Sequence, residues 1–163
     1  MAAASTRGLL VVATVLNGCL AGATIDRGVV GYFAWRELGT NAWVAYSRHA
    51  DLSLRGEILY PALAIGGALC CIGAAISHYR DRRDGGAALP IFAGAVLAIA
   101  GLLLTLKAAP FMLSLAQLGD DAQAAEQAFD GFYFWSLLRG ACQVLAFVAN
   151  VWALAALGRA ATR

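Results

Sequence analysis

Four apolar stretches, each long enough to cross a lipid bilayer as a helix, constrain this chain more than any other feature. They run from about Gly8 to Thr24, Leu59 to Ser77, Ala88 to Ala108 and Phe132 to Leu157. A spanning helix needs about 20 mostly apolar residues, and irregular backbone is not tolerated against lipid. The sequence therefore predicts an all-α fold, a bundle of four transmembrane helices that forms a single domain over residues 1–163.

The composition agrees with a membrane protein whose partners include the surrounding lipids. Hydrophobic residues make up 61% of the chain and charged residues 13%, whereas soluble domains average about 25% charge. The net charge is only +2 and the basic residues form no nucleic-acid-binding patch, so we expect no nucleic acid partner. All four cysteines lie in apolar stretches without a C-x-x-C pair, and we predict no metal site.

The first apolar stretch also has features of a secretory signal peptide, with Arg7 ahead of the apolar run and small residues at 21–23. We favour a retained helix because the run is long enough to span and the bundle needs it as a packing partner. Gly18 and Gly22 have the spacing that lets a second helix approach closely, so a homo-oligomer through this pair is one expectation.

Three polar residues, Thr14, Asn17 and Thr24, share one face of this first helix. A polar stripe on a spanning helix is expected to face the bundle interior. The alternative is that the threonines bond their own backbone carbonyls, which leaves Asn17 as the informative member. We include Asn17 among the candidate substrate-binding residues.

The longest polar stretch, Asp26–Glu57, holds eight of the 22 charged residues (12 basic plus 10 acidic). We expect the first helix to continue through Phe33 and to end at Gly39. A short interfacial helix, capped by Thr40 and running from residue 41 to about 50, should follow before the second spanning helix.

Aromatic residues are concentrated in this stretch and in the neighbouring ends of the spanning helices. They predict either an ordinary interfacial aromatic belt or an aromatic-walled cavity for a flat hydrophobic ligand. If there is a cavity, the candidate wall residues are Trp35, Trp43, Tyr46 and Trp135.

Basic residues predict the orientation in the membrane. The N-terminus, the second connection and the C-terminus carry six basic residues against two acidic ones, whereas the opposite end carries six basic and eight acidic. The positive-inside rule places both termini and the second connection in the cytoplasm, at the plasma membrane if the protein is bacterial. The six basic residues are Arg7, Arg80, Arg82, Arg83, Arg159 and Arg163.

The fourth helix carries an intramembrane cation, Arg139, on one face with Gln143 and Asn150. An ionisable residue in a spanning helix indicates a functional site and needs a partner. Asp26 and Glu57 are the candidate partners because both are expected at the same depth. The alternative is a structural ion pair whose arginine extends to the interface.

Only one histidine, His49, lies on the side of Asp26–Glu57. A site that needs two histidines cannot be assembled there. His49 could accept a proton near neutral pH with Asp51 or Glu57 orienting it, or it could be an ordinary exposed histidine.

The layout resembles the small four-helix integral membrane proteins related to fungal anthrone oxygenases. The resemblance covers nearly the whole chain and rests on three segments, LNGCLAGATI in the first helix, LKAAPF at the end of the third and FWSLLRG opening the fourth. Family members have a Trp followed one turn later by an Arg, which maps onto Trp135 and Arg139. They also often have Pro-x-Asn after the third helix, where this chain has Pro110-Phe111-Met112.

The resemblance implies an oxygenase that acts on a flat lipophilic, anthrone-like substrate without a bound cofactor, with dioxygen as the co-substrate. His49 would then be the base, oriented by Asp26 or Glu57, and Arg139 and Lys107 would stabilise the developing oxyanion. The main alternative is a non-enzymatic accessory subunit or lipid-binding protein. A membrane enzyme of the glutathione-transferase type matches in size, but its cofactor site would need an Arg-rich cleft on the cytoplasmic side, whereas the intramembrane charges of this chain are expected on the other side.

Overall fold

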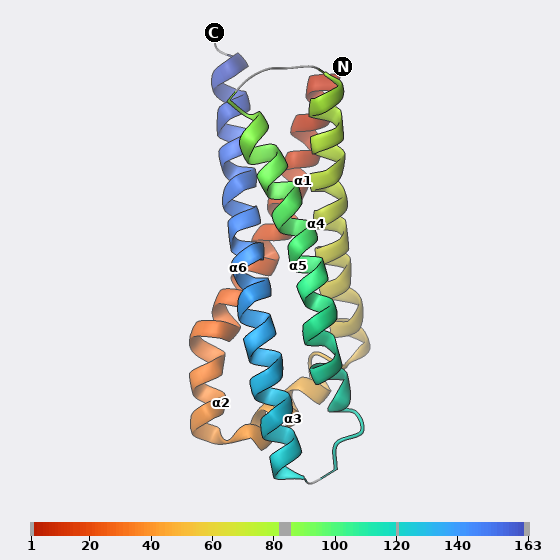
Figure 1. Ribbon diagram of the computed structural model, residues 1–163, viewed down its shortest axis with the longest axis vertical. Helices are drawn as coiled ribbons and strands as arrows, with labels where there is room; N and C mark the ends of the chain where they lie inside the picture. Colours follow the sequence, from red (N-terminus) through yellow and green to blue (C-terminus); the bar gives the residue numbers. More distant parts are fainter. Residues whose placement is uncertain (1, 82–85, 120, 162–163) are drawn as a thin grey trace.

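The computed structural model describes residues 2–81, 86–119 and 121–161, and all regular elements in these ranges are helical. The elements are α1 (Ala2–Ile25), the π-helix η1 (Asp26–Gly31), α2 (Tyr32–Leu38), α3 (Thr40–His49), α4 (Leu54–Arg80), α5 (Ala88–Ser114) and α6 (Ala122–Ala161). Figure 1 shows α1, α4, α5 and α6 running lengthwise together, with α2 and α3 gathered at one end. The predicted four-helix bundle with a short helix between its first and second spanning helices is confirmed.

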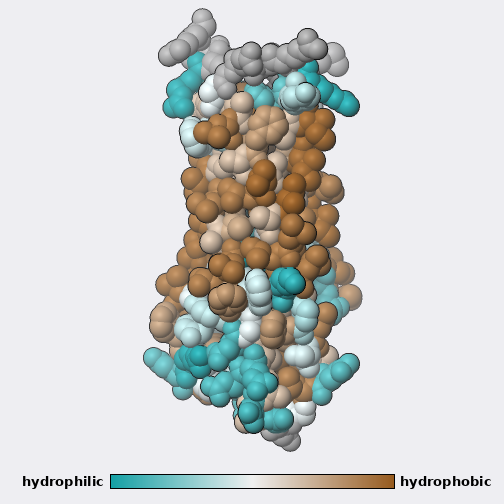
Figure 2. All heavy atoms as spheres, viewed as in Figure 1, coloured by the Kyte–Doolittle hydropathy of each residue, from teal (hydrophilic) through white to brown (hydrophobic). Residues whose placement is uncertain are grey.

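Each of the four long helices is long and apolar enough to cross a membrane. Large apolar side chains point outward from all of them, including Val15, Leu69, Val96 and Leu145, each more than half exposed. Figure 2 shows apolar side chains covering the middle of the visible face, with most polar side chains gathered below this apolar region and a few above it. An apolar exterior of this extent is stable in lipid rather than in water, so the chain is an integral membrane protein.

The ends of α1, α4, α5 and α6 that lie opposite α2 and α3 meet at one end of the bundle (Figure 1). This agrees with the even number of spans on which the predicted orientation depends. Of the residues used for that prediction, five lie outside the described ranges, namely Arg82, Arg83, Asp84, Asp120 and Arg163. Which end faces the cytoplasm stays a prediction.

Small side chains let the four long helices approach closely. Ala13, Ala74, Ala146 and Ala153 are all fully buried where the helices meet, as expected where packing rather than water exclusion drives association. Gly18 is also used inside the bundle, since a Cβ there would lie 3.1 Å from the Phe147 ring. Gly22 has open space beside it, and association of two copies through this glycine pair stays a prediction.

The long helices extend beyond their predicted ends because local caps and packing outweigh the apolar pattern. The helix α4 begins at Leu54 rather than Leu59, since the Ser53 hydroxyl accepts a hydrogen bond from Gly56 N at 3.3 Å. Pro61 therefore lies inside α4 rather than in its first turn, and α5 continues past Pro110 to Ser114.

The acidic connection expected before the fourth span is mostly helix. Asp121 Oδ1 accepts hydrogen bonds from Gln123 N at 3.0 Å and from Ala124 N at 3.1 Å, so α6 begins at Ala122 instead of Phe132. Arg139 consequently lies near the middle of α6 and not close to the start of the helix, as a start at Phe132 would have placed it.

The first helix continues without a break through η1 into α2, as predicted, and ends at Gly39 with φ of 92°. The following α3 begins at Thr40 itself, without a hydrogen bond from the Thr40 side chain to the helix start. We call α2, α3 and residues 122–133 of α6 the cap. Its core contains Trp43 and Phe129, and Arg36 of α2 pairs with Asp130 of α6 at 2.7 Å. The short helix therefore folds onto the bundle instead of resting only at an interface.

Candidate functional site

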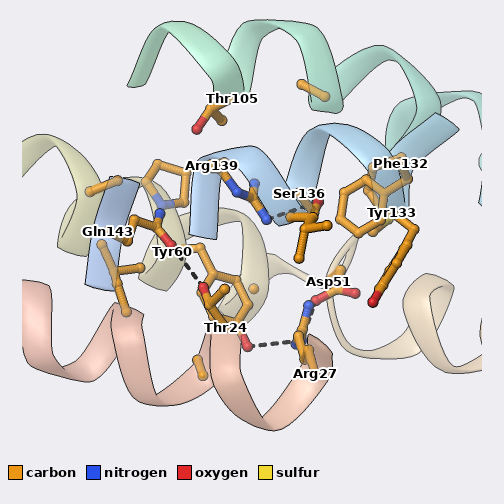
Figure 3. Close-up of a pocket in the computed structure, with 18 of the residues that line it drawn as sticks. Thr24, Arg27, Asp51, Tyr60, Thr105, Phe132, Tyr133, Ser136, Arg139 and Gln143 are labelled. Atoms are coloured by element: carbon orange, nitrogen blue, oxygen red, sulfur yellow. Dashed lines mark hydrogen bonds and ion pairs between the residues drawn. The ribbon is translucent and has the colours of Figure 1, made fainter. Parts of the chain in front are cut away.

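A cavity of about 690 Å³ lies where the cap meets the four spanning helices. The residue types in its wall differ between its two ends. Figure 3 shows Gln143 and Thr105 toward one end and the aromatic residues Phe132 and Tyr133 toward the other. Between these ends lie polar groups, of which Arg139 and Ser136 come from α6. Phe132 and Gln143 are separated by about 16 Å along α6 at 1.5 Å per residue.

One end of the cavity is aliphatic and lies within the apolar band. Its side chains come from three spanning helices and include Leu20, Ala64, Ile65, Leu102, Leu103 and Leu106. Between α1 and α6, Thr24 donates a hydrogen bond to Gln143 Oε1 at 2.7 Å. This bond satisfies two polar side chains that would otherwise be exposed to hydrocarbon. Thr14 instead donates a hydrogen bond to the Leu10 carbonyl of its own helix. For this threonine the alternative prediction, a bond to its own backbone, is confirmed.

The other end is aromatic and is formed by the cap together with the neighbouring part of α6. It is lined by Trp35, Trp43, Phe129, Phe132 and Tyr133. The Trp43 ring packs edge-on against Phe129 with 5.1 Å between centroids and lies 5.9 Å from the Phe132 centroid. Trp43 is only 1% exposed, so these rings form a preorganised wall rather than a belt at the membrane surface.

An ion pair lies between the two ends of the cavity. Arg27 of η1 contacts Asp51 Oδ1 at 2.6 Å, and the same guanidinium nitrogen donates to the Tyr60 hydroxyl at 2.9 Å. The Arg27 guanidinium also lies over the ring of Tyr60, with 5.0 Å to its centroid. Asp51 comes from the connection between α3 and α4, so this contact attaches the cap to the first and second spans.

Arg139 is the second cation of the cavity wall, and it lacks an acidic partner among the described residues. One guanidinium nitrogen donates to Ser136 Oγ at 3.2 Å, one turn earlier in α6, and the Phe132 ring lies 5.7 Å away. Its Nε is buried and has no hydrogen-bond partner in the described ranges. Neither predicted partner, Asp26 nor Glu57, forms an ion pair with it.

Four of the predicted site residues line the cavity, namely Glu57, Arg139, Trp35 and Trp43. Tyr46 lies beside it, since its ring packs on Trp35 with centroids 5.6 Å apart, whereas Trp135 packs at 5.2 Å on Phe134, an exposed residue that does not line the cavity. Neither of these two side chains contributes to the cavity wall.

The expected convergence of Asp26, His49, Glu57 and Arg139 does not occur in the structure. His49 is exposed, and its Nδ1 lies 2.9 Å from the Ala45 carbonyl oxygen of its own helix. Asp26 and Lys107 are also exposed and away from the cavity wall. On α3 the inward face carries Trp43 and Ser47, and His49 lies on a different face of the same short helix.

Asn17 belongs to a separate buried polar cluster closer to the opposite end of the bundle. Its amide nitrogen and that of Asn150 each lie 3.5 Å from Cys71 Sγ, and the Cys71 thiol in turn lies 3.6 Å from Asn150 Oδ1. Gly67 and Gly94 leave room for the two asparagine side chains. This cluster joins α1, α4 and α6 and does not reach the cavity.

Sequence reasoning missed the Arg27–Asp51 pair. Phe129, Phe132 and Tyr133 belong to the aromatic concentration that predicted a possible cavity, but they were not among the candidate wall residues. A signal for Arg27 was present, because it follows Thr24 by three residues and so lies at the edge of the polar face. No local pattern links residues 27 and 51.

The described residues contain no group of three or more His, Cys, Asp or Glu side chains arranged to hold a metal ion. No protein-family model matches the chain, and no curated protein or solved structure is significantly similar to it. Fold and site together define a class, a small four-helix integral membrane protein with a cavity between its spans and its cap. The relationship to anthrone oxygenases stays a prediction from the sequence.

Proposed function

We propose that this protein binds a lipophilic small molecule taken from the surrounding bilayer. The observation that carries the proposal is the cavity of about 690 Å³ between the spans and the cap. Ligand sites for drug-sized molecules occupy about 300–1,000 Å³ and are mostly apolar with a few polar groups that fix orientation. The long aliphatic and aromatic wall with one short polar zone has this character.

Access from the lipid supports the same proposal. Ile65 of α4 and Leu103 and Leu106 of α5 line the cavity and are also at least half exposed on the outer surface. At these positions a single layer of side chains separates the cavity from hydrocarbon. A lipophile in the bilayer can therefore reach the site by side-chain rotation, without entering water.

A filling substitution tests binding. Ala64 lines the cavity, whereas Ala62 of the same helix is exposed and does not line it. Wild type, Ala64→Phe and the matched control Ala62→Phe are purified in nanodiscs, and extracted small molecules are compared with those from empty discs by mass spectrometry. We expect a lipophile enriched with wild type and Ala62→Phe and reduced about tenfold or more with Ala64→Phe, a loss of about 1.4 kcal/mol in binding.

Equal enrichment with both variants contradicts binding in this cavity. If no molecule is enriched over empty discs, the wild-type protein is titrated with an anthrone, whose fluorescence reports on occupancy. Failure to saturate in that titration rejects the proposal.

Our second candidate function is catalysis in the same cavity, by a cofactor-independent oxygenase. The presence of Glu57 and Arg139 in the cavity wall favours it. Glu57 would remove a proton from the activated CH₂ of an anthrone-like ring, and Arg139 would stabilise the resulting enolate oxyanion. The carbanion would then react with dioxygen, so that the CH₂ becomes a carbonyl and the second oxygen atom leaves as water. His49 lies outside this wall, so Glu57 replaces it as our candidate base.

Oxygen consumption with an anthrone separates this candidate from binding alone. We expect Glu57→Gln to reduce turnover about 100-fold or more and His49→Ala to leave it unchanged. If the protein retains a lipophile but consumes no oxygen with an anthrone, the oxygenase candidate is rejected. The non-enzymatic alternative, a lipid-binding protein or accessory subunit, then stands.

A further inference from the structure

The charges around the cavity are unequally paired. Arg27 is neutralised by Asp51 at 2.6 Å. Arg139 forms no ion pair in the described part of the chain, and Asp51 acts on it only from beyond ion-pair distance. Its hydrogen bond goes to the neutral Ser136 hydroxyl, the Phe132 ring lies 5.7 Å away, and its Nε is buried without a hydrogen-bond partner there. The remaining carboxylate of the wall, Glu57, is on an exposed residue and forms no ion pair in the described part of the chain.

A guanidinium in this position requires an acceptor. Removing an arginine from water into a low-dielectric wall costs several kcal/mol unless an anion compensates it, and ionisable groups in spanning helices pair with one another or with a substrate. The fixed planar fork of an arginine matches a carboxylate or a ring-bound oxyanion better than it matches a neutral lipid. The protein supplies the cation at Arg139 and leaves the anion to the ligand.

The residue types on either side of Arg139 indicate what the rest of the ligand consists of. Toward the cap, the rings of Phe132 and Phe129 lie about two and three turns before Arg139 in α6. In the opposite direction the wall becomes aliphatic at Leu102 and Ile65. Figure 3 shows the Arg139 side chain between Phe132 on one side and Gln143 on the other. Rings stack on rings, and flexible chains fill irregular aliphatic space.

We propose that the ligand is an amphiphile made of a flat ring with an acidic oxygen substituent and an aliphatic tail. The ring lies among the aromatic side chains of the cap, the anionic oxygen is bound by Arg139, and the tail follows the aliphatic end between α4 and α5. This inference rests on the proposed binding function and adds the chemical class of the molecule.

The test uses four probes with the full-length protein in zwitterionic nanodiscs at alkaline pH. An octyl-naphthoic acid is compared with its methyl ester, with naphthoic acid that lacks the tail, and with decanoic acid that lacks the ring. Binding is followed by quenching of tryptophan fluorescence for the naphthyl probes, since Trp35 and Trp43 line the cavity, and by competition for decanoic acid. Empty discs give the partition background.

We expect wild type to bind the octyl-naphthoic acid about 30-fold or more tighter than its ester, as a buried charge-assisted pair implies. Arg139→Gln should bring the two affinities within about threefold of each other, Arg139→Lys should retain part of the preference, and Arg55→Gln, outside the cavity, should leave it intact. Both truncated probes should bind about tenfold or more weakly.

Equal binding of acid and ester to wild type overturns the assignment of an anionic ligand while leaving lipophile binding intact. Equal binding of decanoic acid and the octyl-naphthoic acid overturns the ring. Loss of probe binding in phosphatidylglycerol discs would assign Arg139 to a membrane phospholipid and also overturn the proposal. If neither acid nor ester binds while the Ala64→Phe comparison shows no retained lipophile, the proposed function itself fails.

Discussion

Arg27 in η1 and Asp51 in the connection between α3 and α4 form an ion pair of 2.6 Å beside the cavity. Their side chains are 24% and 8% exposed, so the contact is largely removed from water. It joins the continuous first helix to the segment by which the chain returns from the cap into the second span. The cap and the cavity wall therefore depend on the same contact.

Loss of the Asp51 carboxylate should destabilise the cap. Asp51→Asn leaves Arg27 buried without its anion, and we expect a loss of about 3 kcal/mol in the free energy of unfolding, as found when one partner of a buried pair is removed. Unfolding in mixed micelles of increasing denaturing detergent measures it. The matched control is Asp26→Asn, an exposed carboxylate that should cost less than about 0.5 kcal/mol. Equal effects of the two substitutions would contradict a structural role for the pair.

A methyl group at Gly56 should be strongly destabilising. A Cβ at this position would overlap the carbonyl oxygen of Ala50 and lie 2.6 Å from that of Asp51, and these backbone atoms cannot rotate away. We expect Gly56→Ala to cost about 2 kcal/mol or more. Gly8→Ala, where nothing lies within 4 Å of the added Cβ, should be neutral or slightly stabilising. Thermal unfolding of both variants in the same detergent measures the difference. Equal unfolding midpoints would contradict the predicted clash at Gly56.

The cluster around Cys71 should contribute a modest part of the stability of the spans. Cys71→Ala removes the partner shared by Asn17 and Asn150, and we expect a cost of about 1–2 kcal/mol, the range for polar contacts between helices in membranes. Cys19 is exposed, so Cys19→Ala should change the unfolding free energy by less than about 0.5 kcal/mol. A Cys71→Ala protein as stable as the Cys19 variant would show that the cluster contributes nothing.

Arg48 should hold the connection between α5 and α6. Its guanidinium donates to the Leu115 carbonyl at 2.9 Å and also to the Leu118 carbonyl. Without these bonds we expect the amides of residues 115–117 in Arg48→Met to exchange hydrogen about tenfold or more faster, since each charge-assisted bond contributes about 1.5–3 kcal/mol. Mass spectrometry of amide exchange measures this. Arg55→Met, at an exposed residue, should leave the rate unchanged, and a similar increase there would indicate a nonspecific effect of charge.

The ends of the helices show where sequence reasoning stopped being sufficient. Hydropathy located all four spans, but α4, α5 and α6 each continue beyond the apolar stretch. Ser53 and Asp121 start their helices by accepting backbone hydrogen bonds, and both residues are recognisable capping types. The continuation of α5 through Pro110 could not be inferred from composition, because neighbouring helices decide whether a proline is tolerated.

The candidate site was predicted in part. Glu57, Arg139, Trp35 and Trp43 line the cavity, while His49 does not. The difference has a geometric cause, since successive helical residues are separated by about 100° and a small rotation of a short helix changes which side chain points inward. Nothing in the sequence of α3 determines that rotation.

The sequence by itself determined that this chain has four helices long and apolar enough to cross a membrane, because in lipid such apolar stretches must satisfy their backbone hydrogen bonds internally. It also determined that the first helix ends at Gly39, the one described glycine with positive φ. Only the tertiary structure decided that the following segment folds back as a cap and that Arg27 pairs with Asp51 while Arg139 is left without an anion. Those outcomes depend on contacts between residues far apart in the chain, whose energies are set by burial and mutual orientation rather than by local pattern.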